Sequence, residues 1–591
     1  MGRVDLTIEV CGMSGDGTIA AGGLLNLAMS KAGFSVLAFD SYPAEIRGFG
    51  RCVTRSRIGD SELQALTDST QVLISLDDEQ SLSRVPFLEE KALVLFDSNP
   101  PTPVDEARSL AARLSPEMTL VGVPFRDLAT RVSGSARGRN LTALGALAVI
   151  MGLPEEHFQE VIIAKFTPKG EKVVEANLKS FRAGCDHVRQ ELAKMIREPL
   201  RPPARGEGPE RIMLSGNLAI AHGAMDAGLK SYYGYPITPA TPIMEYLAKK
   251  LPQAGGRVIQ MEDEISSIGA VLGSFFAGAR AMTATSGPGF ALMTELITHG
   301  VMSETPAVII DAQRAGPATG LPTKTEQSDL TAAVFGGPGD SPRIVIAPTN
   351  VTECYHYTVQ SFKLAERYQT PVIVLSDFYL DNRVENVAMP RASEEEIADG
   401  NVYPDPAEKD RYQRYRLTDN GISPRSLPGA EGFLFAATGL EHTERGIPNY
   451  DPDNHQKMSQ KRLAKIRSAL ADLDEPLELG PREDYDLGVI GWGSTWGSVQ
   501  EAVVKAREEG QKVGGLKITS IYPFHEEVIR GFMDRCAQVL IPELNLEGQL
   551  ATLIGHLFHG QVVRLNRVTG VPIAPAVILD KINEIIGKGR R

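Results

Sequence analysis

Short apolar runs alternate with amphipathic stretches along the first third of the chain. Residues 4–12 are mostly apolar and lead through a glycine-rich turn into a helical pattern over residues 19–32. Strand-like runs recur at residues 35–40, 71–76, 92–97 and 119–124, with helical patterns between them and at residues 141–151 and 155–164. Because strands that alternate with helices build parallel sheets, this pattern predicts an α/β domain over residues 1–196.

The alternation stops at residues 197–211, which are rich in proline, glycine and charge and are predicted to be a linker. It resumes over residues 212–400. Helices and strands are predicted there in turn, at residues 217–227, 231–234, 243–251, 257–261, 265–278, 281–285, 290–302 and 307–312, and the alternation continues to about residue 381.

Residues 401–480 are polar and irregular, apart from a helical pattern over residues 458–470. A connection of this length is typical of a lid, a subunit contact or an excursion between domains. Alternation returns over residues 481–591, beginning with a strand at residues 487–491. The predicted fold class is therefore α/β, with three open, mostly parallel-sheet domains.

The composition narrows the classes of protein that fit. The 591 residues exceed the size of a single core. The net charge is −13 and no basic block is present, so no nucleic-acid partner is expected. No apolar run is long enough to span a bilayer, and the N-terminus lacks the apolar stretch of a signal peptide. We expect a cytoplasmic protein without membrane contact.

The cysteines give no sign of a local metal site. The chain has five, scattered at Cys11, Cys52, Cys185, Cys354 and Cys536, and no two of them form a Cys-x-x-Cys pair. This spacing argues against a zinc site or an iron–sulfur cluster made from local sequence. The thiols are expected to be reduced and mostly buried, and no metal ligands are assigned to this chain.

The turn after the first predicted strand carries Gly12, Gly15 and Gly17. Its spacing differs from the G-x-G-x-x-G of dinucleotide-binding folds, and no Lys-Ser/Thr follows as in the phosphate loop of ATPases. Gly15-Asp16-Gly17 also resembles a magnesium motif of thiamine-diphosphate enzymes, but the paired asparagines that complete it are absent. We interpret the segment as a tight turn, with nucleotide binding as the alternative.

A stiff turn, Tyr235-Pro236-Ile237-Thr238-Pro239, follows the strand predicted at residues 231–234. The two prolines hold it extended, directly before a helix whose first backbone N–H groups suit an anionic ligand. Thr238 presents its hydroxyl at this point. The same five residues are also compatible with an ordinary strand-to-helix loop.

Three further motifs follow strand ends in the same domain. They are Gln260-Met261-Glu262-Asp263-Glu264, Thr285-Ser286-Gly287-Pro288-Gly289, and the run from Gln313 to Thr323. Ligands of open parallel sheets lie beyond the carboxyl ends of the strands, so these loops are expected to converge on one rim. In order and spacing the set resembles the 2-oxoacid:ferredoxin oxidoreductases, which use thiamine diphosphate, coenzyme A and iron–sulfur clusters.

The resemblance covers most of the chain. Residues 42–48 and 139–145 resemble the gamma module of these enzymes, and residues 541–550 resemble the C-terminal domain of their alpha subunits. It implies a fused gamma–alpha chain with a gamma-type domain, a pyrimidine-type thiamine-diphosphate-binding domain and a transketolase C-terminal-like domain. Within the last motif, Glu543 and Asn545 fit a ligand role and a capped strand-to-helix turn equally well.

The resemblance also implies roles for single residues. Glu264 would place its carboxyl against the pyrimidine ring of thiamine diphosphate and favour the reactive tautomer, with Glu262 and Asp263 as nearby alternatives. Acids in a first helical turn also complement the helix dipole. Arg314 would bind the substrate carboxylate through two parallel hydrogen bonds, aided by the hydroxyls of Thr238 and Thr323. The other implied contacts are Tyr235, Pro236, Ile237, Ser286 and Gly287 for the cofactor, and Arg139, which stands where the family commonly has lysine, for the substrate.

The implied reaction converts a 2-oxo acid, coenzyme A and oxidised ferredoxin to acyl-CoA, carbon dioxide and reduced ferredoxin. The favoured substrate is 2-oxoglutarate, with pyruvate or a broader range open. A beta subunit would share thiamine diphosphate and carry Mg²⁺ and an iron–sulfur cluster, ferredoxin would be a further partner, and the expected assembly is a dimer of alpha–beta pairs. The alternatives are a non-catalytic nucleotide-binding protein and a one-chain enzyme of the transketolase type, which lacks its metal motif here.

Overall fold

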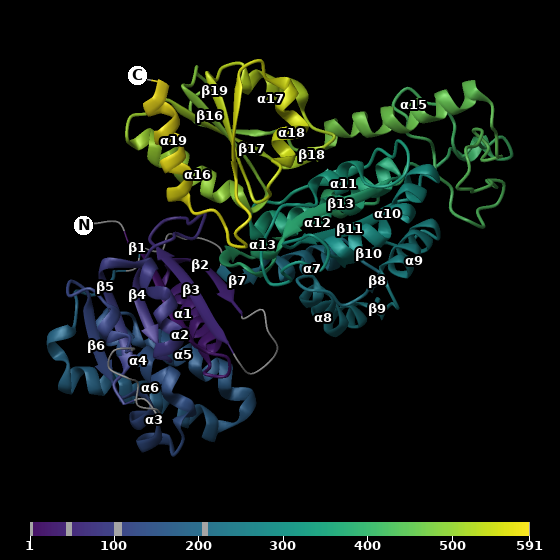
Figure 1. The fold of residues 1–591 in the computed structure, drawn as a ribbon. Helices are drawn as coiled ribbons and strands as arrows, with labels where there is room; N and C mark the ends of the chain where they lie inside the picture. The colour runs from purple at the N-terminus through teal and green to yellow at the C-terminus, as the bar shows by residue number, and fades with distance from the viewer. Residues whose placement is uncertain (1–3, 43–49, 100–108, 202, 204–210, 590–591) are drawn as a thin grey trace. The chain divides into compact units, whose positions relative to one another are not determined.

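The computed structural model describes the chain apart from residues 1–3, 43–49, 100–108, 202, 204–210 and 590–591. The described chain forms two compact units (Figure 1), one made of Met1–Leu214 with Arg383–Met389 and the other of Ser215–Asn382 with Pro390–Arg591. The gamma-type motif predicted at residues 42–48 lies, apart from Tyr42, outside the described residues.

The first unit contains an eight-stranded sheet in the order β6-β5-β4-β1-β3-β2-β14-β7. Its strands are β1 (Asp5–Met13), β2 (Ser35–Ser41), β3 (Arg51–Gly59), β4 (Thr70–Ser75), β5 (Leu88–Asp97), β6 (Thr119–Val123), β7 (Arg211–Ser215) and β14 (Val384–Ala388). Strands β1, β4, β5 and β6 pair in parallel. Strand β3, which the hydrophobic pattern did not indicate, pairs antiparallel with β1 and β2, and β14 pairs antiparallel with β2.

Helices cover this sheet and close packing between two of them forms much of the core. They are α1 (Thr18–Ala32), α2 (Asp78–Ser81), α3 (Phe125–Ser133), α4 (Arg139–Ile150), α5 (Glu155–Phe166) and α6 (Glu171–Glu191). Every residue of α4 after Arg139 is buried. Gly145 lets α6 approach α4, since a Cβ there would lie 3.0 Å from the carbonyl carbon of Phe181. The two helices therefore meet backbone to backbone.

The second unit begins with a seven-stranded sheet in the order β18-β12-β13-β11-β10-β8-β9. Its strands are β8 (Ser231–Gly234), β9 (Arg257–Gln260), β10 (Ala281–Thr285), β11 (Ala307–Gln313), β12 (Ile344–Ile346), β13 (Pro371–Asp377) and β18 (Ser520–Tyr522). Its helices are α7 (Gly216–Asp226), α8 (Thr241–Lys250), α9 (Glu264–Phe276), α10 (Gly287–Met302), α11 (Leu330–Phe335), α12 (Val351–Tyr368), α13 (Phe378–Asn382) and α14 (Glu394–Ile397). All pairings from β12 to β9 are parallel, as the alternation predicted.

The same unit ends in a five-stranded sheet, drawn in yellow-green in Figure 1, in the order β15-β17-β16-β19-β20. Its elements are β15 (Leu477–Leu479), β16 (Leu487–Trp492), α16 (Trp496–Glu508), β17 (Val513–Ile518), α17 (Glu526–Met533), β19 (Gln538–Glu543), α18 (Gln549–Ile554), β20 (Gln561–Asn566) and α19 (Pro575–Gly589). Only β15 pairs antiparallel. The fold class is thus confirmed as α/β with three mostly parallel sheets.

The segment over residues 401–450 and α15 (Pro452–Ser468) attach to the second sheet through a buried ionic cluster. Glu304, in the turn before β11, is fully buried, and its carboxylate pairs with Lys461 Nζ at 2.5 Å and Lys465 Nζ at 2.8 Å. Arg414 donates to the Glu304 carbonyl at 2.7 Å. Since this turn lies at the amino end of β11, the described part of the segment packs at the amino ends of the strands.

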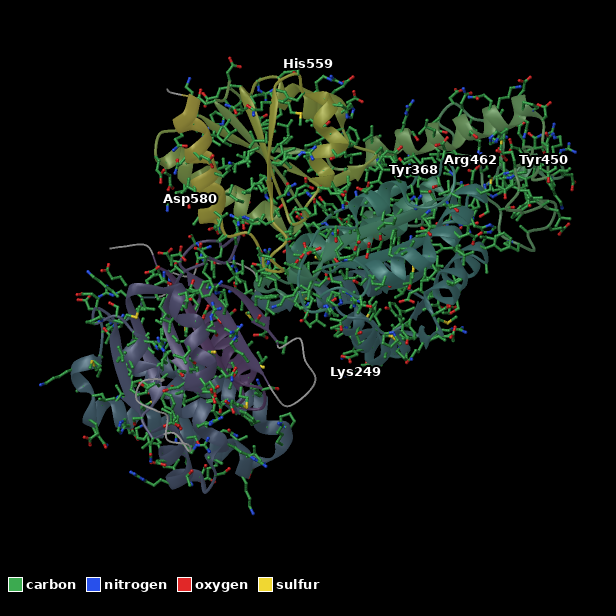
Figure 2. All side chains as sticks on the ribbon, in the orientation of Figure 1. Lys249, Tyr368, Tyr450, Arg462, His559 and Asp580 are labelled. Carbon is green, nitrogen blue, oxygen red and sulfur yellow. The ribbon has the colours of Figure 1, made fainter. Side chains whose placement is uncertain are left out.

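Ion pairs and hydrogen bonds tie α15 to its surroundings along its length. Arg462, labelled in Figure 2, pairs with Glu441 at 2.8 Å, and Tyr368 at the end of α12 donates its hydroxyl to the carbonyl of Ser468, the last residue of α15, at 3.4 Å. No helix in the described ranges is long and apolar enough to cross a membrane.

Candidate functional site

Four loops that carry the predicted site residues follow four adjacent strands. Thr238 follows β8, Glu264 opens α9 after β9, Ser286 and Gly287 follow β10, and Arg314 follows β11. These strands are neighbours in the sheet and run parallel, so their carboxyl ends meet at one edge, which we call the rim. The predicted convergence of the motifs is therefore present in the fold.

Arg314 and the Tyr235–Pro239 turn are joined directly. The Arg314 side chain is buried, and its Nη1 donates to the carbonyl of Thr238 at 2.8 Å. Asn217 on α7 donates to the carbonyl of Pro239 at 3.2 Å and so fixes the turn from the other side. Tyr235, Pro236 and the Thr238 residue itself are exposed, and Ile237 is half-buried. The turn thus presents its side chains at the rim while its backbone is held in place.

Glu264 lies against the loop after β10. Its side chain is buried, and Thr285 Oγ1 lies 3.5 Å from its Oε1. A Cβ on Gly289 would lie 2.6 Å from the Glu264 carboxyl carbon, so glycine is required for this approach. The neighbouring acid Asp263 has a different task, because it caps α9 by accepting from the Ser266 amide at 2.8 Å. Helix capping therefore explains Asp263, and it leaves the Glu264 carboxyl available for a ligand.

The loop after β11 folds back on itself and brings Thr323 towards Arg314. The Leu321 amide donates to the Ala315 carbonyl and the Ala315 amide to the Lys324 carbonyl, both at 2.9 Å. Farther along, Gln327 is fixed by the C-terminal sheet, since its amide donates to the Leu544 carbonyl at 2.8 Å. The loop is consequently held at both of its ends.

Several buried polar atoms at the rim have no hydrogen-bond partner among the described residues. They are Ser286 Oγ, Arg314 Nε, Thr323 Oγ1 and Asp329 Oδ2. Buried polar atoms in proteins are almost always paired, so a group of unpaired donors and acceptors at one edge indicates a bound polar ligand. This edge supplies a cation, two hydroxyls and carboxyl groups, a donor set that fits both a 2-oxo acid and a polar cofactor ring.

Asp329 is a rim residue that the sequence did not single out. It directly precedes α11, where an aspartate is expected to cap the helix, but it makes no side-chain cap hydrogen bond. Its amide donates to Gln313 Oε1 at 3.0 Å, and a Cβ on Gly287 would lie 2.8 Å from its Oδ2. A missing cap is visible only in the structure, and no signal in the sequence distinguishes Asp329 from an ordinary cap.

Arg139 lies in the first unit and its predicted substrate contact stays a prediction. Its guanidinium forms an ion pair with Asp16 in the glycine turn after β1. The next residue, Asn140, donates to the Gly17 carbonyl at 3.1 Å. Gly15 and Gly17 both have positive φ, at 99° and 81°, and Asp16 accepts from the Met13 amide at 2.9 Å. The glycine turn is thus closed by its own contacts and by the start of α4.

Glu543 and Asn545 form a capped turn. The fully buried Glu543 carboxylate accepts from the amides of Leu550 and Ala551 at 2.7 and 3.1 Å, at the start of α18. Asn545 accepts from the Gly548 amide at 2.7 Å. Among the two predicted roles, the structure therefore supports capping.

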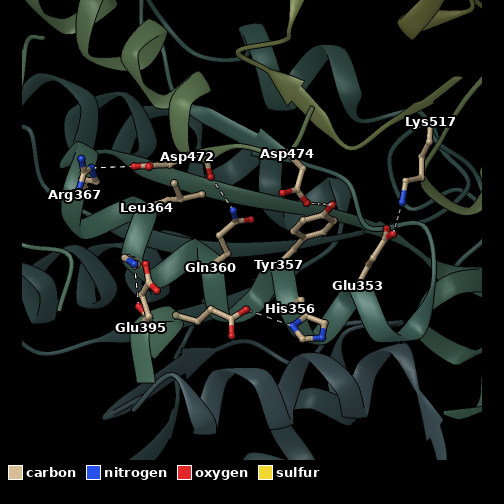
Figure 3. A pocket seen from close by; sticks show the side chains of 12 residues that line it. Glu353, His356, Tyr357, Gln360, Leu364, Arg367, Glu395, Asp472, Asp474 and Lys517 are labelled. Atoms are coloured by element: carbon tan, nitrogen blue, oxygen red, sulfur yellow. Dashed lines mark hydrogen bonds and ion pairs between the residues drawn. The ribbon is translucent and has the colours of Figure 1, made fainter. Parts of the chain in front are cut away.

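A cavity of about 570 Å³ lies along α12 (Figure 3), and none of the residues that line it belongs to a rim loop. Most of its polar side chains have partners, among them Glu353 with Lys517 at 2.6 Å, Arg367 with Asp472 at 2.9 Å and Tyr357 with Asp474 at 2.8 Å. Because these groups already satisfy one another, the rim is the better candidate for chemistry. Within the described residues no group of three His, Cys, Asp or Glu side chains could hold a metal ion.

Three family models match consecutive parts of the chain. They are Pyruvate ferredoxin/flavodoxin oxidoreductase at residues 7–187, Pyruvate flavodoxin/ferredoxin oxidoreductase, thiamine diphosphate-binding, at residues 222–461, and Pyruvate:ferredoxin oxidoreductase core domain II at residues 486–576. The 2-oxoacid:ferredoxin oxidoreductase 2 alpha subunit of Aeropyrum pernix is 30% identical over 99% of this chain and 98% of its own.

The chain belongs to the 2-oxoacid:ferredoxin oxidoreductase family.

As a member of the 2-oxoacid:ferredoxin oxidoreductases it is an oxidoreductase subunit, and all four rim loops lie within the match to the thiamine-diphosphate-binding model. The 2-oxoglutarate oxidoreductase subunit KorA of Mycobacterium tuberculosis is 32% identical over 98% of this chain and 91% of its own. Among solved structures, a 2-oxoglutarate:ferredoxin oxidoreductase from Magnetococcus marinus with 2-oxoglutarate, coenzyme A and succinyl-CoA bound matches with a TM-score of 0.92 and 36% identity, covering 99% of this chain and 100% of the other.

Proposed function

We propose that this chain is the fused gamma–alpha subunit of an enzyme that oxidatively decarboxylates 2-oxoglutarate. With coenzyme A the products are succinyl-CoA and carbon dioxide, and the two electrons released pass through a partner subunit to ferredoxin. The observation that carries the proposal is the rim itself. Unpaired groups of Arg314 and Thr323 lie on the loop after β11, and the neighbouring loop after β10 packs against Glu264. The choice of 2-oxoglutarate over pyruvate rests on the full-length likeness to proteins named for that substrate.

Arg314 supplies the cation that a 2-oxo acid requires. A guanidinium binds a carboxylate through two parallel N–H donors, and in this chain its Nε is buried and unpaired among the described residues. Its Nη1 is held by the Thr238 carbonyl, which fixes the direction of the planar group. Thr238 and Thr323 contribute hydroxyl donors to the same substrate. Binding here would hold the substrate's carboxylate, which leaves as carbon dioxide, close to the Glu264 loop.

The residues at the rim fit the pyrimidine end of thiamine diphosphate. When bound, this cofactor supplies the electron sink that decarboxylation of a 2-oxo acid needs. Glu264 offers a buried carboxyl to the ring, and Tyr235, Pro236, Ile237, Ser286 and Gly287 line the adjoining loops. Gly289 keeps the space beside Glu264 free of a side chain. We assign the diphosphate, Mg²⁺ and an iron–sulfur cluster to the beta subunit, since the sequence of this chain carries neither a Cys-x-x-Cys pair nor the paired asparagines of the magnesium motif.

The exposed apolar side chains of the rim support a partner at this edge. Tyr235, Ile265 and Leu321 come from three different rim loops and are 43%, 46% and 51% exposed. Large apolar side chains gathered beside a polar site mark an interaction surface, and a beta subunit placed there would complete the site and exclude water. We propose a dimer of alpha–beta pairs. The five free, buried cysteines fit a reducing cytoplasm.

The test is anaerobic dye reduction by this chain co-expressed with its beta-type partner, with coenzyme A and a panel of 2-oxo acids. Activity should be highest with 2-oxoglutarate and should fall by about 10²-fold in Arg314→Ala, mostly through kcat/KM, because a bidentate carboxylate contact is lost. Activity restricted to pyruvate would show that the substrate is pyruvate and not 2-oxoglutarate. No activity with any 2-oxo acid, from a complex shown to contain thiamine diphosphate and iron, would overturn the proposal.

A further inference from the structure

Asp329 has no structural partner that accounts for its position. Its Oδ2 is buried and unpaired in the part of the chain that the structure describes, and it makes no cap hydrogen bond to α11. It lies over Gly287, at the point where β10 gives way to α10, since a Cβ on that glycine would be 2.8 Å from Oδ2. A buried carboxyl oxygen without a partner is costly, so its place at the rim calls for a function.

The charged groups that act on Asp329 are Glu326 and Arg314, and Asp329 in turn acts on Asp311. Burial raises the pKa of Asp329 to about 6, the Glu326 carboxylate adds to that rise, and the Arg314 guanidinium opposes it. Glu326 is itself engaged, because one of its oxygens accepts from the Gly316 amide at 3.2 Å. Burial raises the pKa of Asp311 well above the usual range, and the Asp329 and Asp381 carboxylates add to that rise. Asp329 is the carboxylate whose charge interacts with the charge of the Arg314 guanidinium.

We propose that Asp329 is a positioning residue that takes up a proton when a substrate carboxylate binds to Arg314. In the empty site the ionised Asp329 balances part of the Arg314 charge. An incoming carboxylate takes over that role and places a second negative charge near Asp329, which favours its protonated form. The proton comes from solvent, no covalent bond to carbon changes, and the protonated Oδ2 gains an O–H donor directed into the rim. The inference rests on the proposed function, because the ligand is the carboxylate of the 2-oxo acid.

The consequence is that the affinity for the carboxylate ligand falls as the pH rises. The bound complex holds one more proton than the empty site at pH values between the two pKa values of Asp329, the lower of which is about 6. Linkage then requires that the Kd for the carboxylate ligand rise by up to about tenfold per pH unit above the lower value. Below it, Asp329 is protonated in both states and the Kd is constant.

The experiment is calorimetric titration of the complex of this chain with its partner subunit, using N-oxalylglycine, an amide analogue of 2-oxoglutarate, as the probe. Titrations at pH 6 to 8 in buffers of different ionisation enthalpy give both Kd and the number of protons taken up. We expect wild type to take up close to one proton at pH 7 and its Kd to rise by about tenfold or more from pH 6 to pH 8. Asp329→Asn should show neither effect and should keep a Kd within about threefold of the wild-type value at pH 6.

Glu326→Gln is the matched control. It removes the charge that raises the pKa of Asp329, so the rise in Kd should begin at lower pH while the proton uptake persists. A structural role for Asp329 would lower the affinity of Asp329→Asn at all pH values and leave the pH dependence in place, which would overturn the inference. A flat wild-type profile with tight binding would do the same while leaving the proposed function intact. Failure of wild type to bind the probe at any pH would overturn both.

Discussion

Gly289→Ala tests the Glu264 site without removing any charged group. Gly289 lies in the first turn of α10 and has no left-handed backbone conformation, so alanine is compatible with its backbone. The new methyl group would meet the Glu264 carboxyl carbon at 2.6 Å and would also meet Thr285 Oγ1. Carbon atoms in contact normally lie about 3.5–4.0 Å apart. The carboxyl group must therefore move by about 1 Å.

A displacement of this size in an oriented catalytic group costs on the order of 10²-fold in rate. Stability should change little, because the loss from crowding, about 1–3 kcal/mol, is offset in part by about 1 kcal/mol of helix propensity. The expected signature is a large fall in kcat with a melting temperature within a few degrees of wild type.

The assay is anaerobic, coenzyme A-dependent reduction of viologen by the complex, with thermal unfolding of the same samples. The matched control is Gly273→Ala, a glycine-to-alanine change within α9, where a Cβ would have no atom within 4 Å. It should keep wild-type activity and unfold at the same or a slightly higher temperature. If Gly289→Ala is as active as Gly273→Ala, the assignment of Glu264 to the reaction is wrong. If it unfolds at a much lower temperature, the glycine serves folding instead.

Two further predictions concern stability. Glu304→Gln leaves Lys461 and Lys465 buried without their carboxylate and should cost about 3–5 kcal/mol in denaturant unfolding. Glu431→Gln, at a pair in which Glu431 is 91% exposed, should cost less than about 0.5 kcal/mol, and equal effects would refute the argument from burial. Gly145→Ala should separate α4 from α6 and lower the unfolding free energy of the first unit by about 1–3 kcal/mol. The control Gly23→Ala in α1, where a Cβ would lie in open space, should not lower it. An unchanged unfolding midpoint for Gly145→Ala would contradict the close helix contact.

The sequence allowed the four rim loops to be placed because each follows a short strand-like run in the helix–strand alternation. In a parallel sheet the end of such a run decides which edge a residue occupies, so Thr238, Glu264, Ser286 and Arg314 could be assigned to one edge from local pattern alone. Their order in space, β11-β10-β8-β9, required the structure.

Features that depend on distant pairing were not predictable. Strand β14 joins the first sheet although it lies about 350 residues beyond its neighbour β2, and Asn386 secures it by accepting from the Val36 amide at 2.8 Å. The buried cluster joins Glu304 to Lys461 and Lys465, which follow it in the chain by 157 and 161 positions. In the sequence each of these residues looks like a solvated surface charge. Asp329 is hidden for the same reason, because only the fold reveals that it caps nothing.

The central claim is that a 2-oxo acid loses its carboxylate at this rim through Glu264. The most direct measurement is release of labelled carbon dioxide from 2-oxoglutarate carrying the label at its first carbon, in single turnover by the cofactor-loaded complex. Wild type and Glu262→Gln, which alters the exposed neighbouring acid, should release the label, and Glu264→Gln should be slower by about 10²-fold or more. Release by Glu264→Gln at the wild-type rate, or no release from a wild-type complex shown to hold thiamine diphosphate, would contradict it.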